Sequence, residues 1–465
     1  MTEHDRYLAG VTTDVFPHVQ PVPRENGAHR RPEDDHGSDG EGKHSKSSPL
    51  AVLRDIGFVS FGKYGQYLVT FITVPLIARV LGAHGLGLLA MAMSAYFIGS
   101  LIVDLGITSF MAARVPDAED KHGAETRFAA VNQLRGDYLA VRLSLLLILG
   151  VALGAGLVFG VPEPVQMILL GLFAGGFWSM SEDWLLIGQG RFGASTVYQG
   201  IGRLGYLALL VGVLPRLPSA QVAVLCLLVS SVPTVVATWI DTSRRYGRPS
   251  RPRDVGELLR TGAPVFASRL LITTYGQGAA AIYSVVLNAA ALGLYSAGDR
   301  LVRALQSLLD PIGFALLPRL ARRSSDGNFW RDSVRVLAAC VALAALVSAL
   351  VWVTAPFLIE VIFGTEFLGA TSLLRIEILI LPATTVTSFV TTAILPVRQD
   401  TFGVLTGAVI GTVIAACALG LTFRTHSVHT LVYGSVLVEY TVAAWYLARV
   451  RMLVLRDRRN KDHHA

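Results

Sequence analysis

Long apolar segments, separated by short polar stretches, fill the sequence after residue 50. An α-helix of about 20 apolar residues crosses a hydrocarbon core roughly 30 Å thick, and the segments reach that length. They run approximately over 56–81, 86–113, 138–160, 164–188, 194–215, 219–241, 262–287, 291–318, 334–362, 368–396, 402–423 and 428–450. The pattern therefore predicts an all-α integral membrane protein with about twelve transmembrane helices.

The first two segments recur in the second half of the chain. Residues 57–115 align without a gap on residues 263–321, so that the turn Val80–Leu88 falls on Val286–Leu294. In the same register Lys63 falls on Arg269, and Asp104 falls on Asp310. An internal repeat in a hydrophobic chain is typical of transporters, whose substrate site lies between the repeats. We therefore expect two six-helix repeat lobes.

The polar stretches set the remaining boundaries. Residues 1–50 have no apolar run and predict a disordered polar tail, and the lobes are expected over 51–243 and 262–455. A basic linker, 244–261, divides them, and 456–465 form a basic C-terminal tail. Because each lobe has an even number of spans, the repeats should be related by an axis along the membrane normal.

Basic residues concentrate on one side of the predicted membrane. That side holds Arg114, Lys121, Arg127, Arg135, Arg142, Arg191, Arg244, Arg245, Arg248, Arg251, Arg253, Arg260, Arg319, Arg322, Arg323, Arg331, Arg335, Arg398 and the tail after Arg449. The opposite side holds little beyond Arg216 and Arg424. By the positive-inside rule both termini are predicted to be cytoplasmic in a multi-pass protein of the cell (inner or plasma) membrane. The net charge of +7 is then explained by orientation, and we expect no nucleic-acid partner.

Composition excludes several other classes. Only 16% of the residues are charged, against about 25% in soluble domains. The three cysteines lie inside apolar segments and have no metal-binding or disulfide spacing. No glycine-rich loop precedes a Lys-Ser or Lys-Thr pair, so we predict no cofactor, no catalytic residue and no bound metal. The predicted external loops are very short, which argues against an enzyme that works on that side.

Charged residues inside the predicted spans are the candidate functional groups, because a charge in a membrane needs a partner or water. Lys63, Arg269, Arg300 and Arg303 would present cationic heads between the lobes, as a site for an anion requires. Two alternatives remain: Lys63 and Arg269 snorkel to headgroups, or Arg300 and Arg303 form a closed salt-bridge network with Asp299 and Asp310.

Acidic residues in the spans are candidates for ion coupling. Asp104 and Asp310 lie near the cytoplasmic ends, where coupling and local pairing with Arg114 or Arg303 are equally supported. Glu377 and Glu439 stand as isolated acids in the tenth and twelfth spans, and each is a candidate protonation site.

Three local patterns resemble a known family, the Wzx-type polysaccharide transporters, or lipid-linked oligosaccharide flippases, of the MATE-like MOP superfamily. They are Ala78–Gly82 followed by Gly85–Leu88; Asp183-Trp184 with Gly188 and Arg191; and Phe363–Phe367 running on to Leu374–Ile376. The resemblance covers about residues 52–455. It implies a MATE-like fold and alternating access to a cationic central cavity. The twelve predicted spans differ from the fourteen of peptidoglycan-precursor flippases.

The resemblance further implies a flippase that moves a polyprenyl-pyrophosphate-linked oligosaccharide to the outer leaflet for exopolysaccharide, capsule or O-antigen-type assembly. Its implied partners are that substrate, membrane lipids, and the polysaccharide polymerase with its chain-length machinery. A cation-coupled multidrug exporter of the same fold is the first alternative, although its cavity should favour acidic groups. An integral-membrane glycan polymerase is the second, and a non-transporting scaffold is a third.

Overall fold

The computed structural model describes residues 49–108, 111–112, 114–115, 127–275, 279–322, 329–395 and 400–462, with side chains left out at 49–71, 309–322 and a few other positions. The predicted tail over 1–50 therefore lies almost wholly outside the described residues. Those residues form helices and no strand. The helices are α2 (Pro49–Asp104), α4 (Arg127–Val158), α5 (Glu163–Trp178), α6 (Asp183–Gly188), α7 (Phe192–Val213), α8 (Ala220–Tyr246), α9 (Val255–Tyr275), α10 (Ala279–Tyr283), α11 (Ala289–Arg322), α12 (Phe329–Phe363), α13 (Ala370–Glu377), α14 (Ile380–Phe389), α15 (Thr401–Thr425) and α16 (Val428–Asp462).

The helices fall on the apolar segments that the sequence predicts. The first two segments make up α2, which turns at Gly82 because its φ of 67° breaks the helical path. Three other segments are interrupted: α5 is followed by the short α6, α9 by α10, and α13 and α14 by a π-helical turn, Val390–Ile394. Among the described residues, eight helices are long and apolar enough to cross a membrane. The total of twelve crossings stays a prediction.

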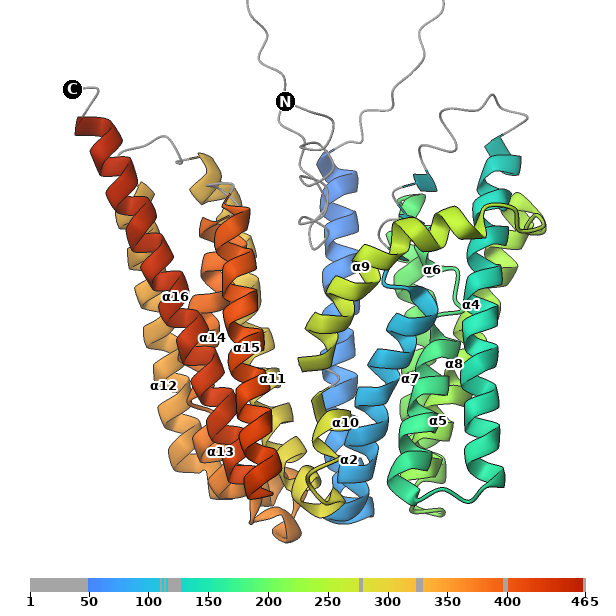
Figure 1. Cartoon of the computed structure of the whole chain (residues 1–465), viewed down its shortest axis with the longest axis horizontal. Coiled ribbons are helices and arrows are strands. Elements are labelled where there is room, and N and C mark those ends of the chain that lie inside the picture. The colour runs from blue at the N-terminus through green and yellow to red at the C-terminus, as the bar shows by residue number, and fades with distance from the viewer. Residues whose placement is uncertain are drawn as a thin grey trace, which may run out of the picture.

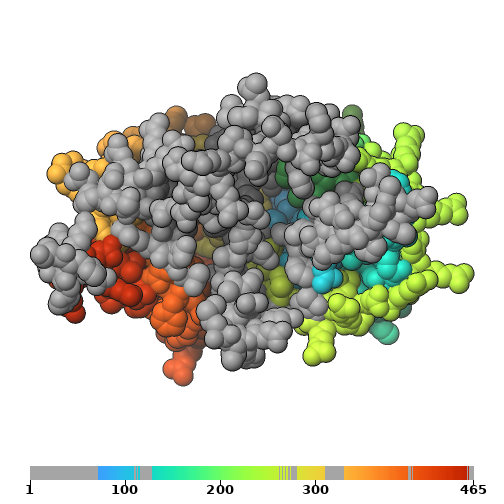
Figure 2. All heavy atoms as spheres, turned by 90° about the horizontal axis from the view of Figure 1, so that it is seen from above, coloured from blue at the N-terminus to red at the C-terminus, as the bar shows by residue number. Residues whose placement is uncertain are grey.

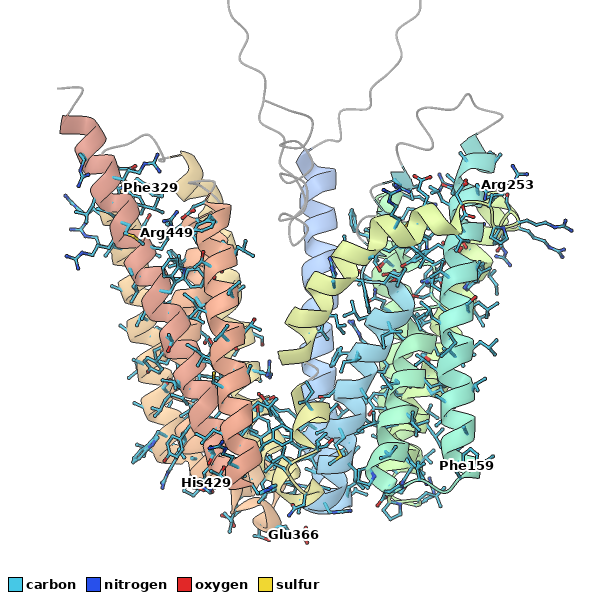
Figure 3. All side chains as sticks on the ribbon, viewed as in Figure 1. Phe159, Arg253, Phe329, Glu366, His429 and Arg449 are labelled. Carbon is cyan, nitrogen blue, oxygen red and sulfur yellow. The ribbon has the colours of Figure 1, made fainter. Side chains whose placement is uncertain are left out.

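The helices form two groups that diverge toward one end (Figure 1). One group contains α2 and α4 to α8, the other contains α11 to α16, and α9 runs obliquely beside the first. We call them the N-group and the C-group. The start of α2 and the end of α16 lie at the same end of the molecule (Figure 1). Arg253, Phe329 and Arg449 lie toward this end, whereas Phe159, Glu366 and His429 lie at the other (Figure 3).

Burial separates inner from outer helices. In each of the spans Ile72–Asp104 and Ala370–Ile394, 61% of the most apolar 18-residue stretch is buried inside the protein. The corresponding share is 17% for α4 and 11% for α15. The exposed side chains of these outer helices include large apolar ones such as Leu147 and Val413. A surface of this kind suits lipid rather than water, in agreement with the membrane class that the composition predicts.

The two groups touch through the repeated turn. A Cβ atom placed on Gly87 would lie 1.7 Å from the carbonyl oxygen of Ala289, and one placed on Gly293 would lie 1.8 Å from that of Ala83. Gly87 and Gly293 are equivalent positions in the repeat, as are Ala83 and Ala289. The contact is therefore reciprocal, which is the geometry expected of two repeats around a twofold-like axis.

The loop between α8 and α9, which leads from the N-group toward the C-group, is hydrogen-bonded to α4 of the N-group. The backbone N–H of Ser250 donates to the carbonyl oxygen of Asn132 at 3.0 Å. Asp137 accepts from the backbone N–H groups of Arg253 at 2.6 Å and Asp254 at 3.1 Å. Of the basic linker expected over 244–261, only 247–254 is loop, because α8 ends at Tyr246 and α9 begins at Val255. From above, residues of this loop region (yellow-green) protrude at the edge opposite to α16 (red) (Figure 2).

Candidate functional site

Helix α11, which belongs to the C-group, carries a cluster of charged residues. Nε of Arg303 donates to both carboxylate oxygens of Asp299, at 2.8 and 2.7 Å. The side chain of Arg303 is 52% exposed. Glu439 of α16 interacts electrostatically with the same guanidinium. Arg303 therefore belongs to a charge network, as the salt-bridge alternative expected, but it stays accessible.

Arg300 is the least compensated cation of this cluster. Its Nε donates to the Ser296 hydroxyl at 3.2 Å, and no carboxylate of the described residues lies within salt-bridge distance of it. Its electrostatic partners are Asp299 and Tyr206. Tyr206 belongs to α7 in the N-group, so Arg300 lies where the two groups face each other. A guanidinium with one hydroxyl partner keeps most of its five donors available for an anion.

Arg203 extends this cationic region into the N-group. It lies one helical turn before Tyr206 on α7, and its Nη2 donates to Gln199 at 3.2 Å. Its electrostatic partners are Tyr96 and Asp183, and Tyr96 in turn interacts with Tyr206. The chain of electrostatic interactions from Arg203 through Tyr96 and Tyr206 to Arg300 crosses between the groups. We call Arg203, Arg300 and Arg303 the arginine cluster.

Arg269 and Asp104 lie together in a different cluster. The Arg269 side chain packs against Gly106, where its Cδ would be 2.7 Å from an added Cβ, and it interacts electrostatically with Asp104. Asp104 also accepts hydrogen bonds from the hydroxyl groups of Tyr138 and Thr108. Of the local pairings considered for Asp104 and Asp310, neither Arg114 nor Arg303 is among the described partners of Asp104, and pairing of Asp310 lies outside the described side chains. Arg303 pairs with Asp299 instead.

Two further predicted site residues fall on segments whose side chains are left out. Lys63 lies in the first half of α2 and Asp310 in the second half of α11, so their side chains lie outside the described residues. Their assignments to the cationic site and to ion coupling remain predictions.

The two candidate protonation sites differ. Glu439 is partly buried, whereas Glu377 is 2% exposed and ends α13 against the charged face of α11. Its carboxyl group interacts electrostatically with Asp299. The expectation that Glu377 is isolated is therefore wrong in this structure, because α13 packs against α11 and places Glu377 beside Gly298. Among the described residues no group of three or more His, Cys, Asp and Glu could hold a metal ion.

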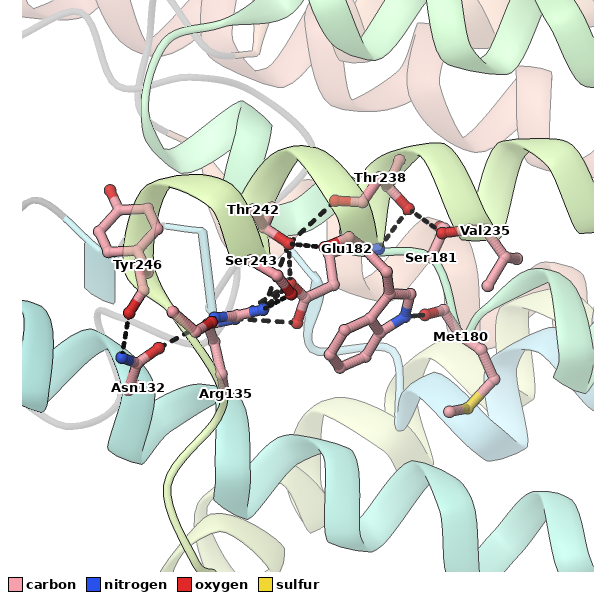
Figure 4. Close-up of polar contacts among 12 residues, drawn as sticks. Asn132, Arg135, Met180, Ser181, Glu182, Val235, Thr238, Thr242, Ser243 and Tyr246 are labelled. Atoms are coloured by element: carbon pink, nitrogen blue, oxygen red, sulfur yellow. Dashed lines mark hydrogen bonds and ion pairs between the residues drawn. The ribbon is translucent and has the colours of Figure 1, made fainter.

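A buried ion pair fixes the break between α5 and α6. Arg135 of α4 is 0% exposed, Glu182 is 1% exposed, and Nη2 of Arg135 lies 2.7 Å from Oε2 of Glu182. Arg135 also donates to the carbonyl oxygen of Gly247 at 2.9 Å, and Thr242 donates to Glu182 (Figure 4). Arg142 adds a hydrogen bond to the carbonyl oxygen of Ser181 at 2.6 Å. From the sequence, these two arginines are predicted only to mark the orientation of the chain.

The sequence contains a signal for Arg203, which is absent from the predicted site. It is a lone arginine in the middle of the predicted span 194–215, and such a charge is a functional candidate for the same reason as Arg300. The proximity of Glu377 to Asp299 had no comparable signal. It joins residues of different spans and depends on the packing of α13 against α11.

Comparison with known proteins identifies the family. Residues 52–324 match the family described as polysaccharide biosynthesis protein. The solved structure of lipid II flippase MurJ in an inward closed conformation is similar with a TM-score of 0.68, at 12% identity over 85% of this chain and 87% of that one. An inward-facing multidrug resistance MATE transporter of the MOP superfamily gives 0.55, at 15% identity over 83% and 95%.

A MATE transporter of Vibrio cholerae gives a TM-score of 0.52, at 14% identity over 89% of this chain and 99% of that one. No curated protein matches. At these identities the structures establish the fold, and the family match covers more than half of the sequence. The chain belongs to the polysaccharide biosynthesis protein family and has the fold of MOP-superfamily transporters.

Proposed function

We propose that this protein is a flippase, not an enzyme, and that it moves a polyprenyl-pyrophosphate-linked oligosaccharide from the cytoplasmic to the outer leaflet. The observation that carries the proposal is Arg300, a guanidinium with a single hydroxyl partner among the described residues, facing Tyr206 of the other group. The family description and the similarity of the fold to a lipid II flippase support the same class.

The substrate's pyrophosphate would bind the arginine cluster, because guanidinium groups donate paired hydrogen bonds to phosphate oxygens. Arg203 and Arg300 would approach the anion from opposite groups, so binding would favour a state in which the groups are close together. Lys63 and Arg269 would meet acidic groups nearer the entrance. The lipid tail would stay in the bilayer, as the divergence of the groups at one end allows (Figure 1).

The orientation belongs to the proposal. The end that carries Arg253 and Arg449 would be cytoplasmic, with both termini, because basic residues favour that side (Figure 3). The protein would then have twelve spans in two lobes in the cell (inner or plasma) membrane. Asp104 and Asp310 remain proposed ion-coupling residues. A polysaccharide polymerase and its chain-length machinery would take up the product on the outer side.

Deletion of the protein in its native host tests the substrate. We expect the completed lipid-linked oligosaccharide to accumulate on the cytoplasmic leaflet. Single repeat units accumulating on the outer leaflet would instead identify a polymerase. Unchanged lipid-linked sugars together with a new drug sensitivity would identify an exporter.

Replacement of Arg300 and Arg303 by alanine tests the site. Each charge-assisted hydrogen bond contributes about 1.5–3 kcal/mol, so binding of a polyprenyl pyrophosphate in nanodiscs should weaken by at least about tenfold. Arg375→Ala is the matched control, since this arginine does not belong to the arginine cluster, and its Nε donates to the carbonyl oxygen of Trp352 at 3.1 Å. Normal flipping by the double variant would refute the assignment.

One observation favours the multidrug exporter as second candidate. Asp299 and Glu377 place acidic groups in the C-group beside the arginine cluster, and cationic drugs need acidic partners. The three arginines weigh against it because they would repel such substrates.

A further inference from the structure

Glu377 is a buried acid that anion binding does not use. It is 2% exposed, and its Oε2 has no hydrogen-bond partner among the described residues. A Cβ atom on Gly298 would lie 2.9 Å from this oxygen, so the absence of a side chain at Gly298 makes room for the carboxyl group against α11. A carboxylate in such a place would cost several kcal/mol, whereas the protonated acid costs much less.

The groups around Glu377 come from four elements. Helix α11 contributes Asp299, Arg303 and Tyr295, and α10 contributes Tyr283, whose ring lies edge-on to Tyr295 at 6.0 Å between centroids. Helix α12 contributes the Ser348 hydroxyl, which donates to the carbonyl oxygen of Ile378 at 3.1 Å. Helix α16 contributes Glu439, which interacts with Arg303.

The charges do not balance when every acid is ionised. Arg303 uses its Nε on Asp299, and no second cation interacts with Glu377 among the described residues. Glu377 is buried beside Gly298, the residue before Asp299, and the two carboxyl groups interact. Two such groups cannot both be ionised at low cost, and one proton between them removes the repulsion. A metal cation is a poor substitute because the Arg303 guanidinium would repel it.

We propose that Glu377 and Asp299 form a proton-binding pair whose occupancy is linked to anion binding at Arg303. In the anion-free protein Glu377 is protonated, and its O–H group donates a hydrogen bond to the Asp299 carboxylate. That carboxylate also accepts hydrogen bonds from Arg303. An anion that engages Arg303 withdraws the guanidinium from Asp299. The pair then takes a second proton from water, which forms an O–H bond on Asp299, so proton uptake and anion binding favour each other.

The first copy of the repeat has no charged residue at the position of Asp299. In the ungapped register Asp299, Arg300 and Arg303 fall on Met93, Ser94 and Phe97, which carry no charge. The proton-binding pair and two of the three arginines therefore lie in the second copy. We infer that the C-group contains the proton-linked half of the site, and the linkage to anion binding rests on the flippase proposal.

Infrared spectroscopy of the purified full-length protein in nanodiscs tests the pair without any substrate. At neutral pH the wild type should show the carbonyl band of a buried protonated carboxylic acid, which Glu377→Gln removes. Asp299→Asn should keep the band but lose it at a lower pH than the wild type. Glu366→Gln is the matched control, because Glu366 is exposed at the end of the molecule that carries His429 (Figure 3), and it should leave the band unchanged.

Two infrared outcomes would overturn the proton site. One is a band that Glu377→Gln leaves intact. The other is a band that sodium ions abolish at constant pH, which would identify a metal-cation site instead. Because Gln resembles the protonated acid in shape and hydrogen bonding, we expect Glu377→Gln to fold, and its unfolding temperature checks this.

Binding of a polyprenyl pyrophosphate across a pH series tests the linkage. Wild-type affinity should fall by up to about tenfold per pH unit as the pH rises through the titration of the pair. In Glu377→Gln this component should be absent, while the titration of the ligand itself is common to both proteins. Equal pH profiles would overturn the linkage. Failure of the ligand to bind either protein would overturn the flippase proposal and leave the infrared result standing.

Discussion

Glu182 shows what a single buried charge contributes. Its carboxylate accepts hydrogen bonds from Arg135 and from Thr242, and both ionic side chains are fully buried. Replacing Glu182 with Gln or Ala should therefore lower the free energy of unfolding by about 3–5 kcal/mol, because Arg135 would remain as an uncompensated buried charge. The measurement is reversible unfolding in mixed detergent micelles.

A double variant separates charge from packing in this pair. Arg135→Met with Glu182→Leu removes both charges and should be less destabilised than Glu182→Ala alone. It will not reach the wild type, since Asn132 and Thr242 lose polar partners. A single variant that costs less than about 1 kcal/mol would contradict the interpretation.

Individual residues also mark the limit of sequence reasoning. Arg300 and Arg303 could be singled out because a charge within an apolar segment stands out from its surroundings. The structure adds what each one contacts: Asp299 for Arg303, and Ser296 with Tyr206 for Arg300. Such contacts depend on helix rotation and on neighbouring helices, and neither follows from the order of residues.

At the scale of elements, the start of α15 provides a pH-dependent test. Asp400 accepts a hydrogen bond from the backbone N–H of Gly403 at 3.1 Å as the N-cap, and Nε of Arg449 on α16 donates to it at 2.6 Å. The bond from Arg449 lowers the pKa of Asp400 below its ordinary value of 3.8, and the bond from Gly403 adds to this.

A lowered pKa gives stability that is present above pH 3.8 and is lost as the pH falls through the lowered value. Asp400→Asn keeps an N-cap oxygen but has no charge for Arg449. At neutral pH it should be less stable than the wild type by about 1 kcal/mol, and the difference should vanish in acid. Unfolding temperatures measured over a pH series check this. A difference that persists in acid would contradict the role of the charge.

Helix positions were the most predictable feature of this chain because long apolar runs have few other stable forms in a membrane. The interruptions were not predictable. The segment 164–188 breaks into α5 and α6. At the break Arg142 donates a hydrogen bond to the carbonyl oxygen of Ser181, and Arg135 donates to the Glu182 carboxylate. The segment 368–396 divides into α13, α14 and a π-helical turn, and Glu377 is the last residue of α13. Such breaks depend on partners that are distant in the sequence.

At the scale of the molecule, the repeat predicted more than the helix pattern alone. Its ungapped register pairs Gly87 with Gly293 and Ala83 with Ala289, and these four residues form the reciprocal contact between the groups. The sequence did not show that the two copies touch at this turn. A contact of backbone against backbone at one end, with the groups diverging at the other, is the arrangement expected of one state of an alternating-access transporter.

The contact between the glycines should decide which end of the protein is closed. A methyl group on Gly293 would lie 1.8 Å from the carbonyl oxygen of Ala83, so Gly293→Ala has to separate the groups there. Overpacking costs about 1–3 kcal/mol, which shifts a two-state equilibrium by about fivefold to 150-fold. Spin labels at His84 and Ala290, which are equivalent exposed positions of the two copies, should therefore move apart.

Gly212→Ala is the control for this experiment, because nothing lies within 4 Å of a Cβ at Gly212 and the label distance should not change. Cys226, Cys340 and Cys417 are first replaced, so that only the introduced thiols react. Flipping by Gly293→Ala should slow, since the state closed at this end becomes costly to reach. If the labels keep their distance while Gly293→Ala folds with normal stability, the glycine contact does not hold this end closed, and another contact between α2 and the C-group must do so.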